Sequence, residues 1–173
     1  MAELAIPDPC VVLLVGAAGA GKSTFAKRHF PHEAILSSDA MREAIAGDAG
    51  DQRVNRPAFA ALHRALDRRL ASGRLAVVDA TNATAAARRE IRRIAARHGT
   101  PIVAVVFDLP EAIVRARNAG RMGRSVPDEV VTRHLATLAR ARTLGTLEAE
   151  GYAMIVRLPT PTEVDETMIR VGR

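Results

Sequence analysis

The chain has 173 residues, 48% of them hydrophobic, with a net charge of +6 and one cysteine, Cys10. These values predict a single globular domain over residues 1–173 and exclude an internal disulfide. The longest apolar runs are far shorter than a membrane span and no signal-peptide pattern is present, so we expect a cytoplasmic protein that does not contact membranes. The basic charge favours polyanionic partners such as nucleic acid.

Strand-like and helix-like runs alternate along the sequence. In chain order we expect a strand at residues 11–15, a helix at 21–29, a strand at 34–37, helices at 40–46 and 55–72, a strand at 75–79, a helix at 84–97, a strand at 102–107, helices at 109–119 and 127–142, a strand at 152–158 and a helix at 162–170. Asn55 and Thr84 are the expected N-caps of their helices. This alternation predicts an α/β fold, a five-stranded parallel sheet with helices on both faces. Ligands of such sheets bind at the carboxyl ends of the strands.

The first strand leads directly into Gly16-x-x-x-x-Gly21-Lys22-Ser23, the pattern of a phosphate-binding loop. Its glycines let backbone N–H groups turn inward around an anion, and the helix that follows directs its N-terminal dipole to the same place. Lys22 offers a positive charge to the β- and γ-phosphates of ATP or another nucleoside triphosphate, and Ser23 offers a hydroxyl oxygen to Mg²⁺. The flanking strand and helix argue against an ordinary Gly/Ala turn. The expected nucleotide-binding residues are Gly16, Ala17, Ala18, Gly19, Ala20, Gly21, Lys22, Ser23 and Thr24.

Asp39 and Arg42 follow the second expected strand, at the edge of the sheet where ligands bind. Because they are three residues apart, they share one helical face. A carboxylate in this place can take a proton from an acceptor hydroxyl that attacks the γ-phosphate, and an arginine can hold an anion with two hydrogen bonds. Equally, Asp39 can be a helix N-cap and Arg42 a solvated surface residue, and the spacing alone does not separate the two interpretations.

Asp79 ends the third expected strand, Leu-Ala-Val-Val-Asp. An acidic residue after an apolar strand is the arrangement that holds Mg²⁺, directly or through water, in P-loop proteins. The alternative is a capping or turn residue. We favour the metal role because the strand places this carboxylate at the ligand edge of the sheet, so Ser23 and Asp79 are the expected Mg²⁺ ligands.

Arg117, Arg121 and Arg124 are spaced at i, i+4 and i+7, and therefore share one face if a helix continues through them. Like charges in such a row repel each other unless an anion lies between them, and Gly120 and Gly123 supply hinges. The segment at about 117–127 is therefore expected to be a basic lid that closes on nucleotide phosphates. The alternative is an exposed, arginine-rich helix end.

Two other groups of residues are interpreted without a functional role. The arginines of the expected helix 84–97 have no glycine hinges beside them and indicate a solvated face: Arg88, Arg89, Arg92, Arg93 and Arg97. The histidines are dispersed and lack metal-ligand spacing: His29, His32, His63, His98 and His134.

In order and over about residues 10–170, the chain resembles the 5′-hydroxyl polynucleotide kinase domain of bacterial RNA end-healing enzymes, which are P-loop phosphotransferases. The matching segments are Gly-Ala-Ala-Gly-Ala-Gly-Lys-Ser-Thr-Phe-Ala-Lys, Ser-Ser-Asp39-x-x-Arg42, Val-Val-Asp79-Ala-Thr-Asn, Val-Phe-x-Leu-Pro-Glu and Arg117-Asn-x-x-Arg121-x-x-Arg124-x-Val126. The resemblance implies transfer of the ATP γ-phosphate to 5′-hydroxyl ends of RNA or DNA. It also implies an adenylate-kinase-like sheet with strand order 2-3-1-4-5.

The resemblance assigns roles by position. Asp39 would be the general base on the 5′-hydroxyl, and Arg42 would grip the phosphate next to the terminal nucleoside. Arg124 matches a basic lid position, and Val126 matches an apolar residue near the acceptor base. The implied catalytic residues are Lys22, Asp39, Arg42, Arg117 and Arg121, of which Arg117 and Arg121 would clasp the ATP phosphates. Such kinases are often fused to phosphatase or ligase modules, so separate phosphatase or ligase proteins are the partners it implies.

Three functions stay open at this point. The first is a polynucleotide 5′-kinase, which the basic charge and the ordered motifs favour. The second is a small-molecule or nucleoside kinase, such as a metabolite or antibiotic phosphotransferase, which also needs a base and a lid. The third is a nucleotide-binding module without catalysis, which would keep Lys22 and Ser23 but would not need Asp39.

Overall fold

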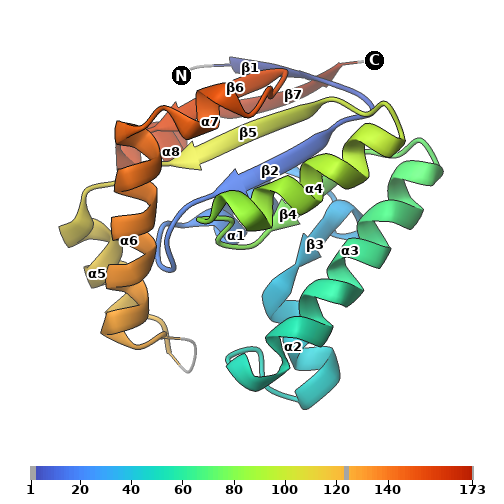
Figure 1. Ribbon diagram of the computed structural model, residues 1–173. Coiled ribbons are helices and arrows are strands. Elements are labelled where there is room, and N and C mark those ends of the chain that lie inside the picture. Colours follow the sequence, from blue (N-terminus) through green and yellow to red (C-terminus); the bar gives the residue numbers. More distant parts are fainter. Residues whose placement is uncertain (1–2, 123–124, 173) are drawn as a thin grey trace.

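The computed structural model describes residues 3–122 and 125–172, and at its centre is a parallel sheet (Figure 1). In the described residues this sheet has five strands in the order β3-β4-β2-β5-β6. The strands are β2 (Val11–Val15), β3 (Ile35–Ser37), β4 (Ala76–Asp79), β5 (Ile102–Phe107) and β6 (Met154–Leu158). Counted along the chain within this sheet, the order is 2-3-1-4-5, so the expected α/β fold and strand order are confirmed.

The helices connect the strands and lie on both faces of the sheet (Figure 1). They are α1 (Lys22–His29), α2 (Ser38–Ala46), α3 (Asn55–Ala71), α4 (Ala85–Arg97), α5 (Glu111–Ala119), α6 (Asp128–Thr143), α7 (Thr146–Ala149) and α8 (Pro161–Glu166), with short 3₁₀ turns η1 (His32–Ala34) and η2 (Gln52–Val54). The expected helices are present within a few residues, and α7 is an addition that the sequence did not suggest. Within the described part of the chain, none of the helices is both long enough and apolar enough to span a membrane.

Every residue of β2 is buried, because the strand has a hydrophobic layer on each side. On one side Val12 and Leu14 pack in a cluster with Phe25 of α1. On the other side Leu13 packs in a second cluster with Leu62 of α3 and residues of α4. Successive side chains of a strand point to opposite faces, so this continuous apolar run is what a central parallel strand requires.

A second, two-stranded parallel sheet joins the two ends of the chain, where β1 (Glu3–Pro7) pairs with β7 (Met168–Gly172). The predicted helix over 162–170 is therefore only half right, since α8 ends at Glu166 and the chain then becomes extended. The β-branched residues Ile169 and Val171 favour a strand. Ile6 of β1 is buried in the hydrophobic core and so attaches this small sheet to it. The sequence did not reveal β1 because a five-residue segment has too few periods to separate strand from loop.

Arg88 is fully buried at the start of α4, against the expectation of a solvated face. Its Nε and Nη2 atoms donate to the Glu150 carboxylate at 2.8 and 2.7 Å. Its Nη1 atom donates to the main-chain carbonyls of Asn82 and Ala83 at 3.1 and 2.6 Å. The arginine therefore fixes the loop between β4 and α4 to the segment that precedes β6.

Cys10 is completely buried immediately before β2, as expected for a small hydrophobe. Burial raises the pKa of its thiol well above the usual value, and the nearby carboxylate of Asp8 adds to this. The thiol therefore stays protonated and out of contact with solvent in the folded protein.

Candidate active site

The phosphate-binding loop connects β2 to α1 and depends on glycine at two positions with positive φ. Gly19 has φ of 88° and Gly21 has φ of 96°, a region that side chains with a Cβ rarely adopt. Gly21 is the N-cap of α1 and provides no side-chain cap, so the first N–H groups of this helix stay open toward a ligand. The backbone thus has the conformation that the expected anion cradle requires.

Gly19 also lies against α5, and here a substitution is expected to be costly. A Cβ at this position would be 2.6 Å from the Val114 carbonyl oxygen. Gly73 has a similar φ of 63° but nothing within 4 Å of its Cβ position, so Gly73→Ala measures the backbone strain alone. We expect Gly19→Ala to lower the free energy of unfolding by about 1–3 kcal/mol more than Gly73→Ala does, because it adds a steric overlap. Urea unfolding of the two variants gives this difference, and equal losses would contradict the close contact.

The remaining loop residues divide into those that face the pocket and those that face the core. Ala18, Lys22, Ser23 and Thr24 are among the residues that line the pocket. Ala17 and Ala20 are buried with their side chains in the hydrophobic core, so only their backbone can meet a nucleotide. Gly16 is held between strands, because a Cβ there would be 2.9 Å from Cβ of Phe107.

Lys22 is buried and directs its ammonium group back over the loop. Its Nζ atom donates to the main-chain carbonyls of Gly16 and Ala17, both at 2.9 Å. Burial lowers the pKa of Lys22 to about 8, although the carboxylates of Asp79 and Asp39 favour the charged form. An ammonium group has three N–H bonds, so one donor is left for a phosphate.

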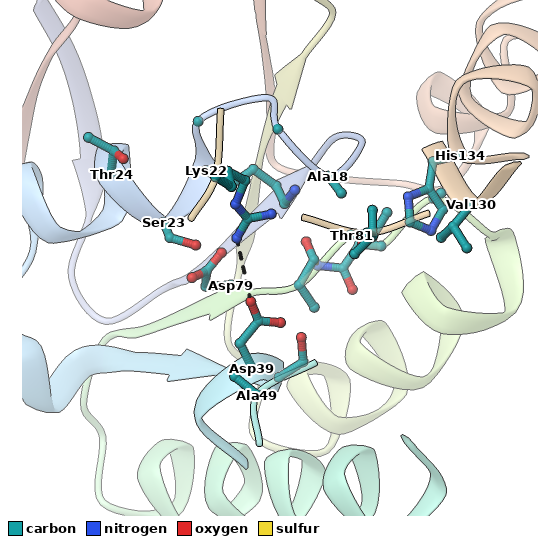
Figure 2. Close-up of a pocket in the computed structure, with 18 of the residues that line it drawn as sticks. Ala18, Lys22, Ser23, Thr24, Asp39, Ala49, Asp79, Thr81, Val130 and His134 are labelled. Atoms are coloured by element: carbon teal, nitrogen blue, oxygen red, sulfur yellow. Dashed lines mark hydrogen bonds and ion pairs between the residues drawn. The ribbon is translucent and has the colours of Figure 1, made fainter. Parts of the chain in front are cut away.

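Asp79 ends β4 beneath Lys22 and beside Ser23, as Figure 2 shows. Burial raises the pKa of Asp79 above its usual value, and the opposing effects are the charge of Lys22 and a hydrogen bond from the Ser23 hydroxyl. A buried carboxylate paired with a hydroxyl fits Mg²⁺, which takes one or two protein oxygens and fills its other positions with water and phosphate. Within the described residues no larger cluster of His, Cys, Asp or Glu could hold a metal alone.

Asp39 and Arg42 lie together on α2. Asp39 is not the helix N-cap and Arg42 is not a solvated surface residue, which was the alternative that the sequence left open. The N-cap of α2 is Ser37, whose hydroxyl accepts from the Ala40 N–H, so Asp39 is free of that role. Arg42 is only 8% exposed and donates to the Asp39 carboxylate. Asp39 stands at the carboxyl end of β3, on the same edge of the sheet as Asp79 (Figure 2).

Asn55 and the loop before it hold the guanidinium group of Arg42 in place. Arg42 donates from Nε to the Ala49 carbonyl at 2.6 Å and from Nη1 to Oδ1 of Asn55 at 2.9 Å. The predicted N-cap role of Asn55 is wrong, since the residue is already inside α3 and its side chain is turned to Arg42 instead. With Nη2 on Asp39, one N–H on each terminal nitrogen of Arg42 is left for an anion.

The expected lid brings Arg117 and Arg121 to the pocket, although not on one continuous helix. The helix α5 ends at Ala119, with Gly120 as its C-cap, so Arg121 lies beyond it. Arg117 Nη1 is 3.3 Å from the point where a Cβ of Gly21 would be, above the phosphate loop. Arg121 Nη2 is 3.8 Å from Asp39 Oδ2, so this side chain reaches across the pocket. Arg124, the third predicted lid arginine, lies outside the described residues.

Val126 lies on the wall of the same pocket and is held there by Asn118. The Asn118 amide nitrogen donates to the Val126 carbonyl at 2.9 Å, and the Val126 N–H donates to the amide oxygen at 3.2 Å. This pair of bonds fixes the chain where it leaves the lid and enters α6.

The residues described above surround a pocket of about 630 Å³, which opens at the carboxyl ends of the strands (Figure 2). It brings together Lys22, Ser23, Thr24, Asp39, Arg42, Asp79, Arg117, Arg121 and Val126, all of which the sequence had singled out. Among the lining residues that were not predicted are Asn55, taken as a helix cap, and His134, dismissed for its lack of metal spacing. The sequence offered no signal for either, because each is brought to the pocket by folding alone.

A protein-family model described as an AAA domain matches residues 11–144, which is most of the chain. The chain belongs to this family. The match contains both the phosphate loop and the lid segment, so this AAA domain includes nearly every residue of the pocket. No curated protein sequence matches the chain.

Solved structures agree with this AAA domain in fold. A chain of the Pnkp1/Rnl/Hen1 RNA repair complex matches with a TM-score of 0.69 and 23% identity, over 80% of this chain and 47% of that one. A chain of the AvrRxo1-ORF1:AvrRxo1-ORF2 complex matches with a TM-score of 0.64 and 16% identity, over 83% and 52%. A gluconokinase from Sinorhizobium meliloti 1021 matches with a TM-score of 0.58 and 21% identity, over 93% and 88%. The chain thus has a P-loop kinase fold and spans about half the length of the first two structures.

Proposed function

We propose that the chain is a polynucleotide 5′-hydroxyl kinase that transfers the γ-phosphate of ATP to 5′-hydroxyl ends of RNA or DNA. The observation that carries this proposal is the pair Asp39–Arg42, which faces the phosphate loop across one pocket. A carboxylate can take the proton of an acceptor hydroxyl. An arginine with two unused N–H groups can bind the phosphate next to the terminal nucleoside that carries this hydroxyl. A 5′-terminal nucleotide offers these two groups together.

The donor would bind along the phosphate loop. The open N–H groups at the start of α1 and the remaining N–H of Lys22 would hold the phosphates, with Arg117 and Arg121 on the opposite side. Ser23 and Asp79 are the residues that would hold Mg²⁺. When bound, Mg²⁺ neutralises the negative charge that the β- and γ-phosphate oxygens carry during transfer.

The acceptor would enter from the side of α2 and α3. Its 5′-oxygen would attack the γ-phosphorus opposite the bond to the β-phosphate oxygen, forming a new P–O bond while that bond breaks and ADP leaves. Asp39 would take the proton of the hydroxyl, and Arg42 would orient the strand by its phosphate. Asn55 and Ala49 support this, because they fix the plane of the Arg42 guanidinium before any acceptor binds.

A small-molecule kinase is the second candidate. The observation in its favour is likeness of fold, because the gluconokinase matches 93% of this chain with a TM-score of 0.58. If the kinase acts on polynucleotides, we propose that residues 1–173 form one domain with its lid at about 117–127, and that phosphatase or ligase enzymes act together with it.

Transfer of labelled γ-phosphate from ATP to a panel of acceptors tests the two candidates. The panel contains 5′-hydroxyl RNA and DNA oligonucleotides, free nucleosides, and sugar acids such as gluconate. We expect labelled oligonucleotides and no labelled sugar acid. Labelling of a small alcohol alone would establish the second candidate, and nucleotide binding without any transfer would leave a non-catalytic module.

The lowered pKa of Lys22 predicts how ATP affinity depends on pH. Above a pKa of about 8, this lysine is neutral in the free protein and must take up a proton before it can attract a phosphate. We therefore expect the Kd for ATP to rise from pH 8 to pH 10, by up to about tenfold for each pH unit. Calorimetric titration of Lys22→Met should give weak binding with a flat profile. The exposed Lys27→Met is the control and should keep the wild-type profile.

A further inference from the structure

His134 lies on α6, beside Val130, at the end of the pocket away from Thr24 (Figure 2). Its Nδ1 atom is the one buried side-chain nitrogen or oxygen without a hydrogen-bond partner in the described part of the chain. Its other ring nitrogen, Nε2, is not among those buried atoms. A buried ring nitrogen without a hydrogen-bond partner is unusual, because buried polar atoms are normally satisfied.

The surroundings of His134 favour a neutral ring. Burial lowers the pKa of His134, and the positive charges of Lys22 and Arg133 lower it further. A neutral imidazole carries one N–H proton. A buried N–H group without an acceptor costs more free energy than a buried nitrogen lone pair without a donor. The proton therefore belongs on Nε2, so His134, which lines the pocket, has one hydrogen-bond donor available to a ligand.

The position of His134 along the pocket indicates that it contacts the phosphoryl acceptor rather than the nucleoside triphosphate. Thr24 and Val164 line the pocket on the side of α1 and α8, where the nucleoside of a triphosphate held by the phosphate loop would leave it. His134 is on the other side of Lys22 and Asp79, as Figure 2 shows. Val130, beside His134 in Figure 2, and Val126 also line the pocket and offer apolar surface on which a flat ring can lie.

We propose that His134 binds the terminal nucleobase of the acceptor, with Nε2–H donating a hydrogen bond to an oxygen or nitrogen on the edge of that base. The proposal rests on the polynucleotide kinase function above and names a recognition residue for it. Unpaired bases are commonly held in this way, with one face against a flat or apolar surface and one edge hydrogen-bonded. His134 is then a specificity residue that touches the substrate without taking part in phosphoryl transfer.

Kinetics with normal and abasic acceptors test the proposal. His134→Phe keeps a ring without the donor, and His134→Gln places an amide N–H near the position of Nε2. We expect His134→Phe to raise the KM for a 5′-hydroxyl oligonucleotide about three- to tenfold, with kcat and the KM for ATP unchanged. His134→Gln should stay within about twofold of the wild type. With an acceptor whose 5′-terminal residue lacks a base, all three proteins should have the same KM.

The control is His32→Ala, which changes an exposed histidine of η1 outside the pocket and should match the wild type. Thermal unfolding of each variant shows that it is folded, and His134→Phe should be no less stable than the wild type because it removes an unpaired buried nitrogen. An equal rise in KM with the abasic acceptor, a changed KM for ATP, or no change at all would overturn the role of His134 while leaving the kinase function intact. A wild-type protein that labels no oligonucleotide would overturn both.

Discussion

We expect Asp39→Asn to lower the kcat for phosphoryl transfer by about 10²- to 10⁴-fold, the range measured for removal of a general base. The amide keeps the shape of the side chain but cannot accept the proton of the attacking hydroxyl. Binding of ATP should be retained, because the groups proposed to hold the phosphates are on the loop, on α1 and on the lid. Single-turnover transfer to a 5′-hydroxyl oligonucleotide, with ATP binding measured separately, gives both quantities.

Glu43→Gln is the matched control for this experiment. It makes the same chemical change on the same helix, at an exposed position away from the pocket, and should leave both kcat and ATP binding unchanged. If Asp39→Asn kept more than a tenth of the wild-type rate, Asp39 would not be the base. If it lost ATP binding instead, its main role would be to hold the lid through Arg121.

The second large effect is expected on stability, at the buried ion pair between Arg88 and Glu150. Arg88→Met removes one partner. It leaves the carbonyls of Asn82 and Ala83 without this donor and the Glu150 carboxylate with the Tyr152 hydroxyl alone. Breaking a buried pair in this way costs about 3–5 kcal/mol of the free energy of unfolding, which corresponds to a fall in Tm of roughly 10 °C. Urea or thermal unfolding measures it directly.

Arg93→Met on the same helix is the comparison, since Arg93 is exposed and its pair with Glu90 lies at the surface. A surface pair contributes at most about 1 kcal/mol, so this variant should unfold close to the wild type. Similar losses for Arg88→Met and Arg93→Met would show that the Arg88 contact does not hold the loop.

The same ion pair predicts a dependence of stability on pH. Burial acts to raise the pKa of Glu150, but hydrogen bonds from Arg88 and Tyr152 outweigh it and hold the pKa below its usual value. A carboxylate with a lowered folded-state pKa stabilises the protein above its unfolded pKa of about 4.3, and this stabilisation is lost as the pH falls through the folded value. Glu150→Gln should therefore flatten the acid limb of the stability profile.

The fold followed from the sequence because its signals are local. The continuous apolar runs of β2, β4 and β5 mark strands buried on both faces. The phosphate loop follows β2 and so identifies it as the first strand of the five-stranded sheet along the chain. The pairing of β1 with β7 was missed for the opposite reason. It is formed between opposite ends of the chain, and neither short segment carries a sufficient pattern of its own.

The candidate site was predicted where a motif places a side chain at the end of a strand, as for Asp39 and Asp79. It was not predicted where a partner comes from a distant element. Asn55 meets Arg42 through a loop, and Arg88 meets Glu150 from 62 residues away. From charge and spacing alone, Arg88 was predicted to be a surface residue, because the sequence does not show that folding brings the Glu150 carboxylate next to it.

Cys10 gives the protein a built-in reporter of its own opening. Cys10 is the one thiol in the sequence, so alkylation by a thiol-specific reagent reports this site alone. Because Cys10 is completely buried immediately before β2, the reagent can reach it only when β2 separates locally from its neighbouring strands. The rate of labelling under native conditions therefore measures how often the central sheet opens locally around Cys10. Comparing that rate with and without nucleotide would show how much a bound ligand tightens the middle of the molecule.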